Sequence, residues 1–291
     1  MNASGKKVIG ILAFLVLVAG VAWALLGNRY TVTASKSPLK TTILKVGKAD
    51  AIVIDAGTET LVIDCGEEED GVELLEYLEK ENIAKIDTLL ITHYDKDHVG
   101  GADTIVESIP VGRVLVPDYD STSTEYLDFL VALEDAGLAA ERLNEKTTFP
   151  LGDATVIVEP PLSYDIPETD SDVQIEYDNN FSLVTTIVHG DNRLVFAGDI
   201  EKQRIREWLD SSDEAVPCTF LKVPHHGVFN SELQNLFECL NPPYTAICDS
   251  KKNPASDDTV KQLKEIRSDV FQTMNGKIIV VSDGNGIEIR Q

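Results

Sequence analysis

Thr92-His93-Tyr94-Asp95-Lys96-Asp97-His98-Val99-Gly100-Gly101 is the stretch that restricts this sequence to few folds. It contains two imidazoles and two carboxylates in the order His-x-Asp-x-Asp-His, directly after the apolar run 86–91. A buried strand that ends in such a loop can aim nitrogen and oxygen ligands at one point, as a hydrolytic metal site requires. We therefore predict a Zn²⁺ site, and the mixture of ligands also tolerates Mn²⁺ or Fe²⁺. The predicted ligands here are His93, Asp95, Asp97 and His98.

Two later strand-like runs end in the same types of side chain. After the apolar run 193–197, the carboxylate of Asp199 is placed to bridge two metals about 3.5–4 Å apart, or to cap a following helix. The run 220–223 leads to His225 and His226, of which one can bind a metal while the other donates a hydrogen bond or moves a proton. The remaining histidine, His189, lies in a predicted hairpin turn and is expected to be solvated.

Three further polar residues adjoin predicted strands. Asp64 ends the run 60–64 and can accept a hydrogen bond from the second nitrogen of a metal-binding histidine, or be an ordinary turn carboxylate. Asn180 and Ser182 precede the run 182–188 and can contact a substrate oxygen or a metal-bound water. Their spacing is equally compatible with ordinary turn residues.

The N-terminal segment differs from the rest of the chain. Lys6 and Lys7 precede the charge-free apolar run 8–26, which nearly spans a bilayer core at ~1.5 Å per residue. Basic residues before the run place the N-terminus in the cytoplasm and the main domain outside. Ala22-Trp23-Ala24 also resembles a signal-peptidase site. We predict that residues 1–27 form a membrane anchor or a cleaved signal peptide, so the protein is membrane-bound or secreted.

Charge limits the partners of the chain. The sequence has 25 basic and 49 acidic residues and a net charge of −24. Such a surface repels polyanions and disfavours a broad nucleic-acid groove, although a small basic patch beside a metal remains compatible with it. The four cysteines have no CxxC spacing and are expected to be buried and unpaired. No feature indicates a protein partner.

The order of elements predicts one α/β (α+β) domain after the N-terminal segment. Residues 28–40 are polar and are predicted to be a linker, and residues 41–291 form the domain. Strand-like and helix-like runs alternate in both halves, with hairpin signals between them, and no fixed repeat is visible. Two mixed sheets packed together, with helices outside, would bury the apolar runs.

Taken together, these motifs resemble the metallo-β-lactamase fold superfamily, and more narrowly the extracytoplasmic hydrolase domain of the competence protein ComEC and its free-standing relatives. The resemblance runs from about residue 41 to residue 289. It implies a four-layer αββα sandwich with one or two metals at the edges of the sheets. By motif, His93 and Asp95 would hold one metal, and Asp97 and His98 the other. Asp199 would approach both metals, and His225 would close the first site, with His226 as its competitor.

The sequence also departs from the motifs of that family. Asp95 stands where many members have a histidine, and Asn180 stands near another such position, so the first metal site is poor in ligands. Of the Gln-Gly-Asp turn usual in this branch, Lys48-Ala49-Asp50 keeps the aspartate alone. Ala255-Ser256 follows Asn253-Pro254 where the branch often has a His-Pro pair.

The resemblance implies hydrolysis by metal-activated water. We expect Asp97 to orient the nucleophile and accept its proton, and Lys222 or His226 to stabilise the developing oxyanion. The first hypothesis for the substrate is a phosphodiester, as in a nuclease acting on single-stranded DNA outside the membrane. The second is a small ester, a lactone or a cell-wall phosphodiester. A third hypothesis is a non-catalytic domain that binds a metal or a partner.

Overall fold

The computed structural model describes residues 37–165 and 177–291. The predicted N-terminal segment 1–27 and most of the predicted linker lie outside these residues. In the described part of the chain, no helix is both long and apolar enough to cross a bilayer. Strand β1 begins at Leu39, so the last two residues of the predicted linker 28–40 belong to the first sheet.

The first sheet is mixed and has eight strands in the order β15-β14-β1-β2-β3-β4-β5-β6. Neighbours from β3 to β6 are parallel, and the other pairs are antiparallel. The strands are β1 (Leu39–Ile43), β2 (Ala51–Asp55), β3 (Thr60–Cys65), β4 (Thr88–Leu90), β5 (Val114–Pro117), β6 (Ala140–Leu143), β14 (Ile278–Ser282) and β15 (Ile287–Arg290).

The second sheet is also mixed and has seven strands in the order β13-β12-β11-β10-β9-β8-β7. Its parallel part runs from β10 to β13, and the rest is antiparallel. The strands are β7 (Thr147–Leu151), β8 (Ala154–Glu159), β9 (Val184–His189), β10 (Asn192–Phe196), β11 (Phe220–Lys222), β12 (Tyr244–Ile247) and β13 (Asp269–Gln272).

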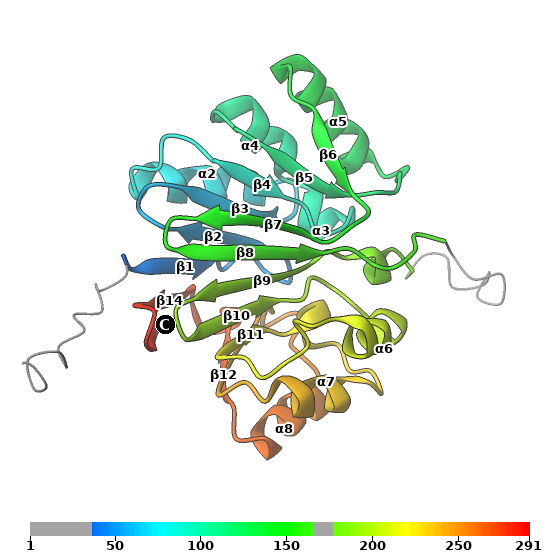
Figure 1. The fold of residues 1–291 in the computed structure, drawn as a ribbon. Coiled ribbons are helices and arrows are strands. Elements are labelled where there is room, and N and C mark those ends of the chain that lie inside the picture. The colour runs from blue at the N-terminus through cyan, green and yellow to red at the C-terminus, as the bar shows by residue number, and fades with distance from the viewer. Residues whose placement is uncertain (1–36, 166–176) are drawn as a thin grey trace, which may run out of the picture. The chain divides into compact units, whose positions relative to one another are not determined.

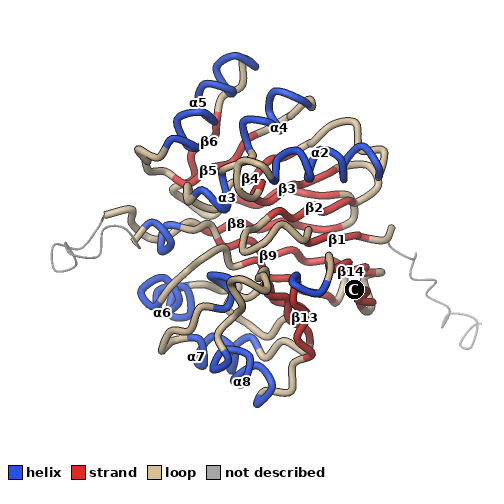
Figure 2. Tube along the Cα trace, turned by 180° about the vertical axis from the view of Figure 1, so that it is seen from behind, coloured by secondary structure: helices blue, strands red, loops and turns tan. Residues whose placement is uncertain are grey.

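Helices cover the outer face of each sheet, which confirms the predicted αββα sandwich (Figures 1 and 2). Those beside the first sheet are α2 (Asp70–Lys80), α3 (Lys96–Val99), α4 (Ala102–Ser108) and α5 (Thr124–Ala136). Those beside the second sheet are α6 (Lys202–Ser211), α7 (Leu233–Leu240) and α8 (Asp257–Glu265). Short 3₁₀ turns are η2 (Asp178–Phe181), η3 (Pro224–Gly227) and η4 (Thr273–Asn275).

Three apolar cores hold these four layers together, and strand alternation divides the side chains among them. In β3, Leu61 and Ile63 face the core between the sheets, whereas Val62 faces the helices of the first sheet. In β10, Phe196 faces the same central core and Val195 faces the helices of the second sheet. Each sheet is therefore buried on both faces.

The parallel strands determine where the polar motifs meet. In the first sheet β3 and β4 are parallel neighbours, and in the second sheet so are β10, β11 and β12. The carboxyl ends of parallel neighbours lie at the same edge of a sheet, where open α/β sheets commonly place their ligand sites. Asp64 lies near the end of β3, and the motifs around His93, Asp199 and His226 follow β4, β10 and β11.

Candidate metal centre

The carboxylate of Asp64 fixes the orientation of the His98 ring. Asp64 Oδ2 lies 2.8 Å from His98 Nδ1, and the same carboxylate accepts hydrogen bonds from Thr92 N and Thr92 Oγ1, both at 2.7 Å. A carboxylate only accepts hydrogen bonds, so Nδ1 of His98 carries the proton. The lone pair of His98 therefore lies on Nε2, on the opposite side of the ring.

The two other histidines of the cluster, His93 and His226, are fixed in the same tautomer. His226 Nδ1 donates to the backbone oxygen of Cys248 at 2.9 Å. His93 Nδ1 lies 3.1 Å from Thr92 Oγ1, whose own proton goes to Asp64, so the hydroxyl accepts from His93. This arrangement, in which a neighbour holds one ring nitrogen and leaves the other as a ligand, is typical of metal-binding histidines.

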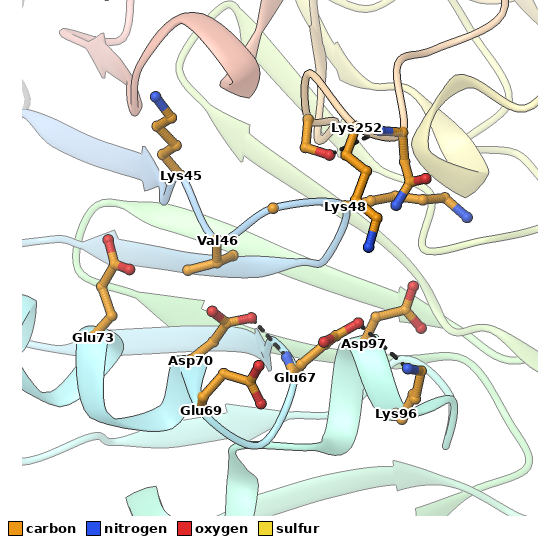
Figure 3. Close-up of a pocket in the computed structure, with 13 residues that line it drawn as sticks. Lys45, Val46, Lys48, Glu67, Glu69, Asp70, Glu73, Lys96, Asp97 and Lys252 are labelled. Carbon is orange, nitrogen blue, oxygen red and sulfur yellow. Dashed lines mark hydrogen bonds and ion pairs between the residues drawn. The ribbon is translucent and has the colours of Figure 1, made fainter.

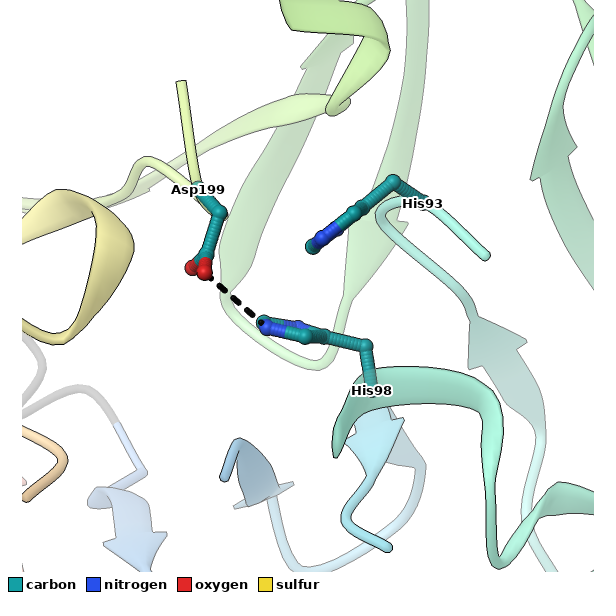
Figure 4. Close-up of side chains that lie close together, drawn as sticks. All are labelled: His93, His98 and Asp199. Carbon is teal, nitrogen blue, oxygen red and sulfur yellow. Dashed lines mark ion pairs between the residues drawn. The ribbon is translucent and has the colours of Figure 1, made fainter. Parts of the chain in front are cut away.

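The free nitrogens of these rings converge with two carboxylates. Asp199 Oδ2 lies 3.3 Å from His98 Nε2 and 3.1 Å from His226 Nε2. Asp97 Oδ2 lies 3.4 Å from His226 Nε2. Ligand atoms of His93, His98 and Asp199 lie within 4.8 Å of one another, and so do those of Asp97, His98 and His226. Figure 4 shows the side chains of the first group pointing toward one another.

The donor set fits a divalent metal ion. The Nε2 atoms of His93, His98 and His226 are buried and have no hydrogen-bond partner among the described residues. Lone pairs that face carboxylates repel them unless a proton or a metal ion lies between the two. Three imidazoles and two carboxylates in this position match the ligands that proteins use for Zn²⁺ and for related transition metals.

The charges of the cluster are strongly coupled. Burial alone would lower the pKa of the His98 and His226 rings. The carboxylates of Asp199 and Asp64 nevertheless raise the pKa of His98 well above its ordinary value. Asp199 likewise raises the pKa of His226 to about 9. Burial would raise the pKa of Asp199, yet His226, His98 and Lys222 together hold it well below its ordinary value. The site thus attracts positive charge.

Gly198 and Ser182 fix the position of Asp199. Gly198 has φ +53°, and a Cβ there would lie 2.8 Å from Ser182 Cβ, so the turn needs glycine. Ser182 Oγ accepts a hydrogen bond from Asp199 N at 3.1 Å, and Ser182 has no exposed surface. Ser182 is thus buried and holds the turn through its hydroxyl, and its predicted contact with substrate stays a prediction that this position does not favour.

Lys222 is also placed differently from the prediction. Its side chain is fully buried, and Nζ contacts Gly198 O at 3.1 Å, Asp199 Oδ1 at 3.4 Å and the carboxylate of Asp50. These two carboxylates raise the pKa of Lys222 despite its burial. This buried position does not favour the predicted role of Lys222 as an oxyanion donor. Lys222 neutralises Asp199 and Asp50 from inside the protein.

Asp50 is the member of this region that sequence reasoning missed as a site residue. It is 1% exposed, and Oδ1 lies 3.6 Å from His226 Nδ1. Its backbone N–H donates to Asp97 O at 3.0 Å, which ties the β1–β2 loop to the central motif. The aspartate kept from the Gln-Gly-Asp turn, between Ala49 and Ala51, is the sequence signal that could have identified it.

The structure reverses the predicted order of His225 and His226. His226 has no exposed side-chain surface and joins the cluster, whereas His225 Nδ1 lies 3.0 Å from Glu201 Oε1 at the edge of the site. Both residues have positive φ, +48° and +52°, and this sharp turn sends the two rings in different directions. The geometry therefore makes His226, and not His225, the candidate ligand from this motif.

Asp95 and Asn180 lie at the periphery. Asp95 is 39% exposed in its side chain, and Oδ2 lies 3.7 Å from His93 Nε2, so it borders the cluster on the solvent side. Asn180 Oδ1 accepts a hydrogen bond from Arg204 N at 3.1 Å and thereby caps the first turn of α6. The amide oxygen of Asn180 thus has a structural partner, and the predicted substrate contact stays a prediction for its amide N–H groups.

The prediction that His189 is solvated is also wrong. His189 ends β9 at the opposite end from Asp199, is 1% exposed, and has Nδ1 2.8 Å from Ser282 Oγ. Asn192 Nδ2 donates to the same hydroxyl at 2.8 Å, so the β9–β10 hairpin is joined to β14. The residue connects the two sheets and takes no part in the candidate metal centre.

Comparison with known proteins agrees with this architecture. A family model described as the metallo-beta-lactamase superfamily matches residues 44–248. ComE operon protein 3 of Bacillus subtilis is 28% identical over 180 residues, which are 62% of this chain and 22% of that protein. Recombination protein 2 of Haemophilus influenzae is 25% identical over 269 residues, which are 88% of this chain and 30% of that protein. The chain therefore spans less than a third of either relative, and the predicted ComEC-like resemblance is confirmed.

Solved structures share the fold. The metallo-beta-lactamase fold protein YhfI from Bacillus subtilis aligns with a TM-score of 0.54 at 11% identity, covering 87% of this chain and 100% of that protein. At this level of identity the likeness concerns the fold alone.

Proposed function

The chain belongs to the metallo-β-lactamase superfamily, and from that membership we propose that it is a hydrolase that cleaves phosphodiester bonds with the help of a divalent metal ion. Members of this superfamily are usually metal-dependent hydrolases. The observation that carries the proposal is the set of three buried Nε2 atoms, on His93, His98 and His226, that face Asp97 and Asp199 without hydrogen-bond partners among the described residues.

The residues of the site have two proposed roles, which are to bind the ion and to orient a water molecule. We propose that one ion is held by His98, His226, Asp97 and Asp199. A second, weaker metal position would be held by His93 and Asp199, and Asp95 borders it. A divalent ion bound there supplies Lewis-acid polarisation and lowers the pKa of a water molecule.

Asp97 is the carboxylate of the cluster that is best placed to contact that water. Its side chain is 19% exposed, compared with 3% for Asp199 and none for Asp64. Burial would raise the pKa of Asp97, but contact with His226 and the proximity of His98 hold it far below its ordinary value. Because it is the most exposed of these three carboxylates, we assign to Asp97 the orientation of the attacking water.

A substrate panel on the full-length, metal-loaded protein tests the proposal. We expect bound metal by mass spectrometry, and hydrolysis of bis-p-nitrophenyl phosphate that is lost in the Asp97→Ala and His98→Ala variants while circular dichroism stays unchanged. Hydrolysis of p-nitrophenyl acetate without hydrolysis of the phosphodiester would favour the ester hypothesis. A folded protein that binds no metal would favour a non-catalytic domain.

We also propose that the domain lies outside the cytoplasm. The support is the sequence alone, in which Lys6 and Lys7 precede a long apolar run. Protease added to intact cells should digest the domain if it is exported and anchored. Protection of the domain, with no protein in the medium, would contradict this location.

A further inference from the structure

A cleft of about 570 Å³ adjoins the candidate metal centre, and Asp97 belongs to both. One wall comes from the loop that follows β1 and from the loop that follows β12, which contribute Lys48 and Lys252. The facing wall comes from the β3–α2 loop and from α2 itself, and it carries Glu69 and Glu73 (Figure 3). A substrate that reaches Asp97 through this cleft must pass between the two walls.

The lysines of the first wall are available to a ligand. Within the described residues, neither Lys48 nor Lys252 has a carboxylate within ion-pair distance, and neither has Lys45, which lines the same wall and also a second pocket against α2. Lys96, on the other side of the cleft, is different, because its ammonium lies 3.6 Å from Glu67. In a chain with a net charge of −24, two unpaired lysines beside the metal centre form a local site for an anion.

The facing wall limits how much negative charge the cleft accepts. Besides Glu69 and Glu73 it contains Asp70, whose pKa is raised to about 6 by burial and by neighbouring carboxylates. A ligand with one negative charge can stay close to the lysines and away from these groups. A nucleic-acid strand carries a charge at every nucleotide, and its neighbouring phosphates would meet the acidic wall.

We propose, building on the phosphodiesterase activity proposed above, that the cleft selects a compact phosphodiester with a single negative charge. In this assignment Lys48 and Lys252 bind the anionic oxygens of the phosphate, and Glu69 and Glu73 reject polyanions. The two lysines are substrate-binding residues, and the two glutamates determine specificity by repulsion.

The lysine wall is tested by steady-state kinetics on bis-p-nitrophenyl phosphate. Lys48→Gln and Lys252→Gln should each raise KM by about threefold to fivefold, with kcat changed less than twofold, since an exposed charge pair contributes up to about 1 kcal/mol. Lys251→Gln is the matched control, because Lys251 is the neighbour of Lys252 in the same exposed loop but does not line the cleft. Equal KM values for Lys252→Gln and Lys251→Gln would overturn the assignment.

The acidic wall is tested with a single-stranded oligonucleotide at low ionic strength. The double variant Glu69→Gln/Glu73→Gln should raise kcat/KM for the oligonucleotide at least about threefold and leave bis-p-nitrophenyl phosphate nearly unaffected. Glu79→Gln is the control, because Glu79 lies on the same helix away from the cleft. A wild-type enzyme that cleaves the oligonucleotide with higher kcat/KM than the small diester would overturn the proposal.

Calorimetric titration with dimethyl phosphate separates this inference from the activity on which it rests. Saturable binding to the wild-type protein that is lost in Lys48→Gln/Lys252→Gln supports the anion site even if no substrate is turned over, in which case the proposed activity alone fails. Hydrolysis of the small diester together with unchanged binding in the double variant would overturn the inference and leave the activity intact.

Discussion

Asp64 Oδ2 lies 2.8 Å from Nδ1 of His98, and both side chains are fully buried. The carboxylate is held in place by Thr92, which donates to it through both its backbone N–H and its hydroxyl. One acid at the end of β3 therefore sets the tautomer of a histidine that follows β4. The orientation of this candidate ligand therefore depends on Asp64, to which we assign no place among the ligands.

Asp64→Asn should weaken Zn²⁺ binding about 10-fold to 100-fold, since removal of a partner that orients a metal-binding histidine has costs of this size. The carboxylate of Asp64 accepts from Thr92 N, Thr92 Oγ1 and His98 Nδ1. An asparagine amide would point an N–H group at one of these three donors, so the proton on His98 Nδ1 would no longer be fixed. Competition with a chromophoric chelator measures the Kd. An affinity within twofold of the wild type would show that Asp64 does not orient the ring.

His226→Ala should remove metal binding, whereas His225→Ala should leave the metal content unchanged. The reason is that His226 Nε2 lies 3.1 Å from Asp199, while His225 pairs with Glu201 at the edge of the site. Mass spectrometry of the purified variants gives the metal content. Loss of metal in His225→Ala alone would restore the order expected from the sequence.

Lys222→Met should lower the free energy of unfolding by about 3–5 kcal/mol, because it leaves Asp50 and Asp199 charged and buried without their cation. Asp50→Asn in the same background should recover part of this loss. Urea denaturation of the two single variants and the double variant gives the coupling between the residues. Strictly additive losses would be evidence against the buried pair.

Asp70→Asn should raise the free energy of unfolding above that of the wild type, and this gain should be larger at neutral pH than at acid pH. Burial raises the pKa of Asp70 to about 6, above its value of about 3.9 in an unfolded chain. Between these two pKa values the folded state keeps a proton on Asp70 that the unfolded state has lost. The free energy of unfolding of the wild type therefore falls as the pH rises from about 4 to about 6. Asparagine carries no charge, and its oxygen can still accept the bond from Glu67 N, which is 2.9 Å from Asp70 Oδ2.

The gain of Asp70→Asn over the wild type should therefore grow by on the order of 1 kcal/mol between pH 4 and pH 6.5, after allowance for solvent screening of a half-buried group. Urea denaturation at several pH values measures this difference, with Glu79→Gln as the control on the same helix. A difference that does not change with pH would refute the assigned pKa.

His189→Ala should lower the free energy of unfolding by about 1–2 kcal/mol, because a buried hydrogen bond to Ser282 is lost. Activity per folded molecule and metal content should stay at wild-type values, since His189 lies at the end of β9 away from the candidate centre. Denaturation and the phosphodiester assay together check this. A variant that is stable but inactive would mean that the centre has been assigned to the wrong end of the sheet.

The fold was predictable from the sequence where apolar runs are buried. The strands that were missed are β6, β7 and β13, and each lies at an edge of its sheet. None of the three is a run of buried apolar side chains, since two of the four side chains of Ala140–Leu143 are exposed and Pro150 interrupts β7. Edge strands avoid aggregation by carrying such residues, so the hydrophobic pattern that identifies a central strand is weak in them.

The candidate site was predictable as a set of motifs but not as a set of roles. Asp64, His98 and Asp199 could be identified from the sequence, because each lies in a short polar motif at or after the end of an apolar run. Whether Lys222 faces a substrate or the interior depends on the location of Asp50, more than 170 residues away in the sequence. The order of His225 and His226 depends on two positive φ angles, which spacing does not reveal.

The pairing of β1 with β14 has a consequence for biosynthesis. Ile43 lies opposite Ile278, so β1 lacks one of its two neighbours until nearly all of the domain has left the ribosome. Contacts between such distant segments form slowly, and an unpaired strand edge can bind other chains in the meantime. A nascent chain halted before residue 278 should therefore be more prone to aggregate and to be captured by chaperones than the finished protein.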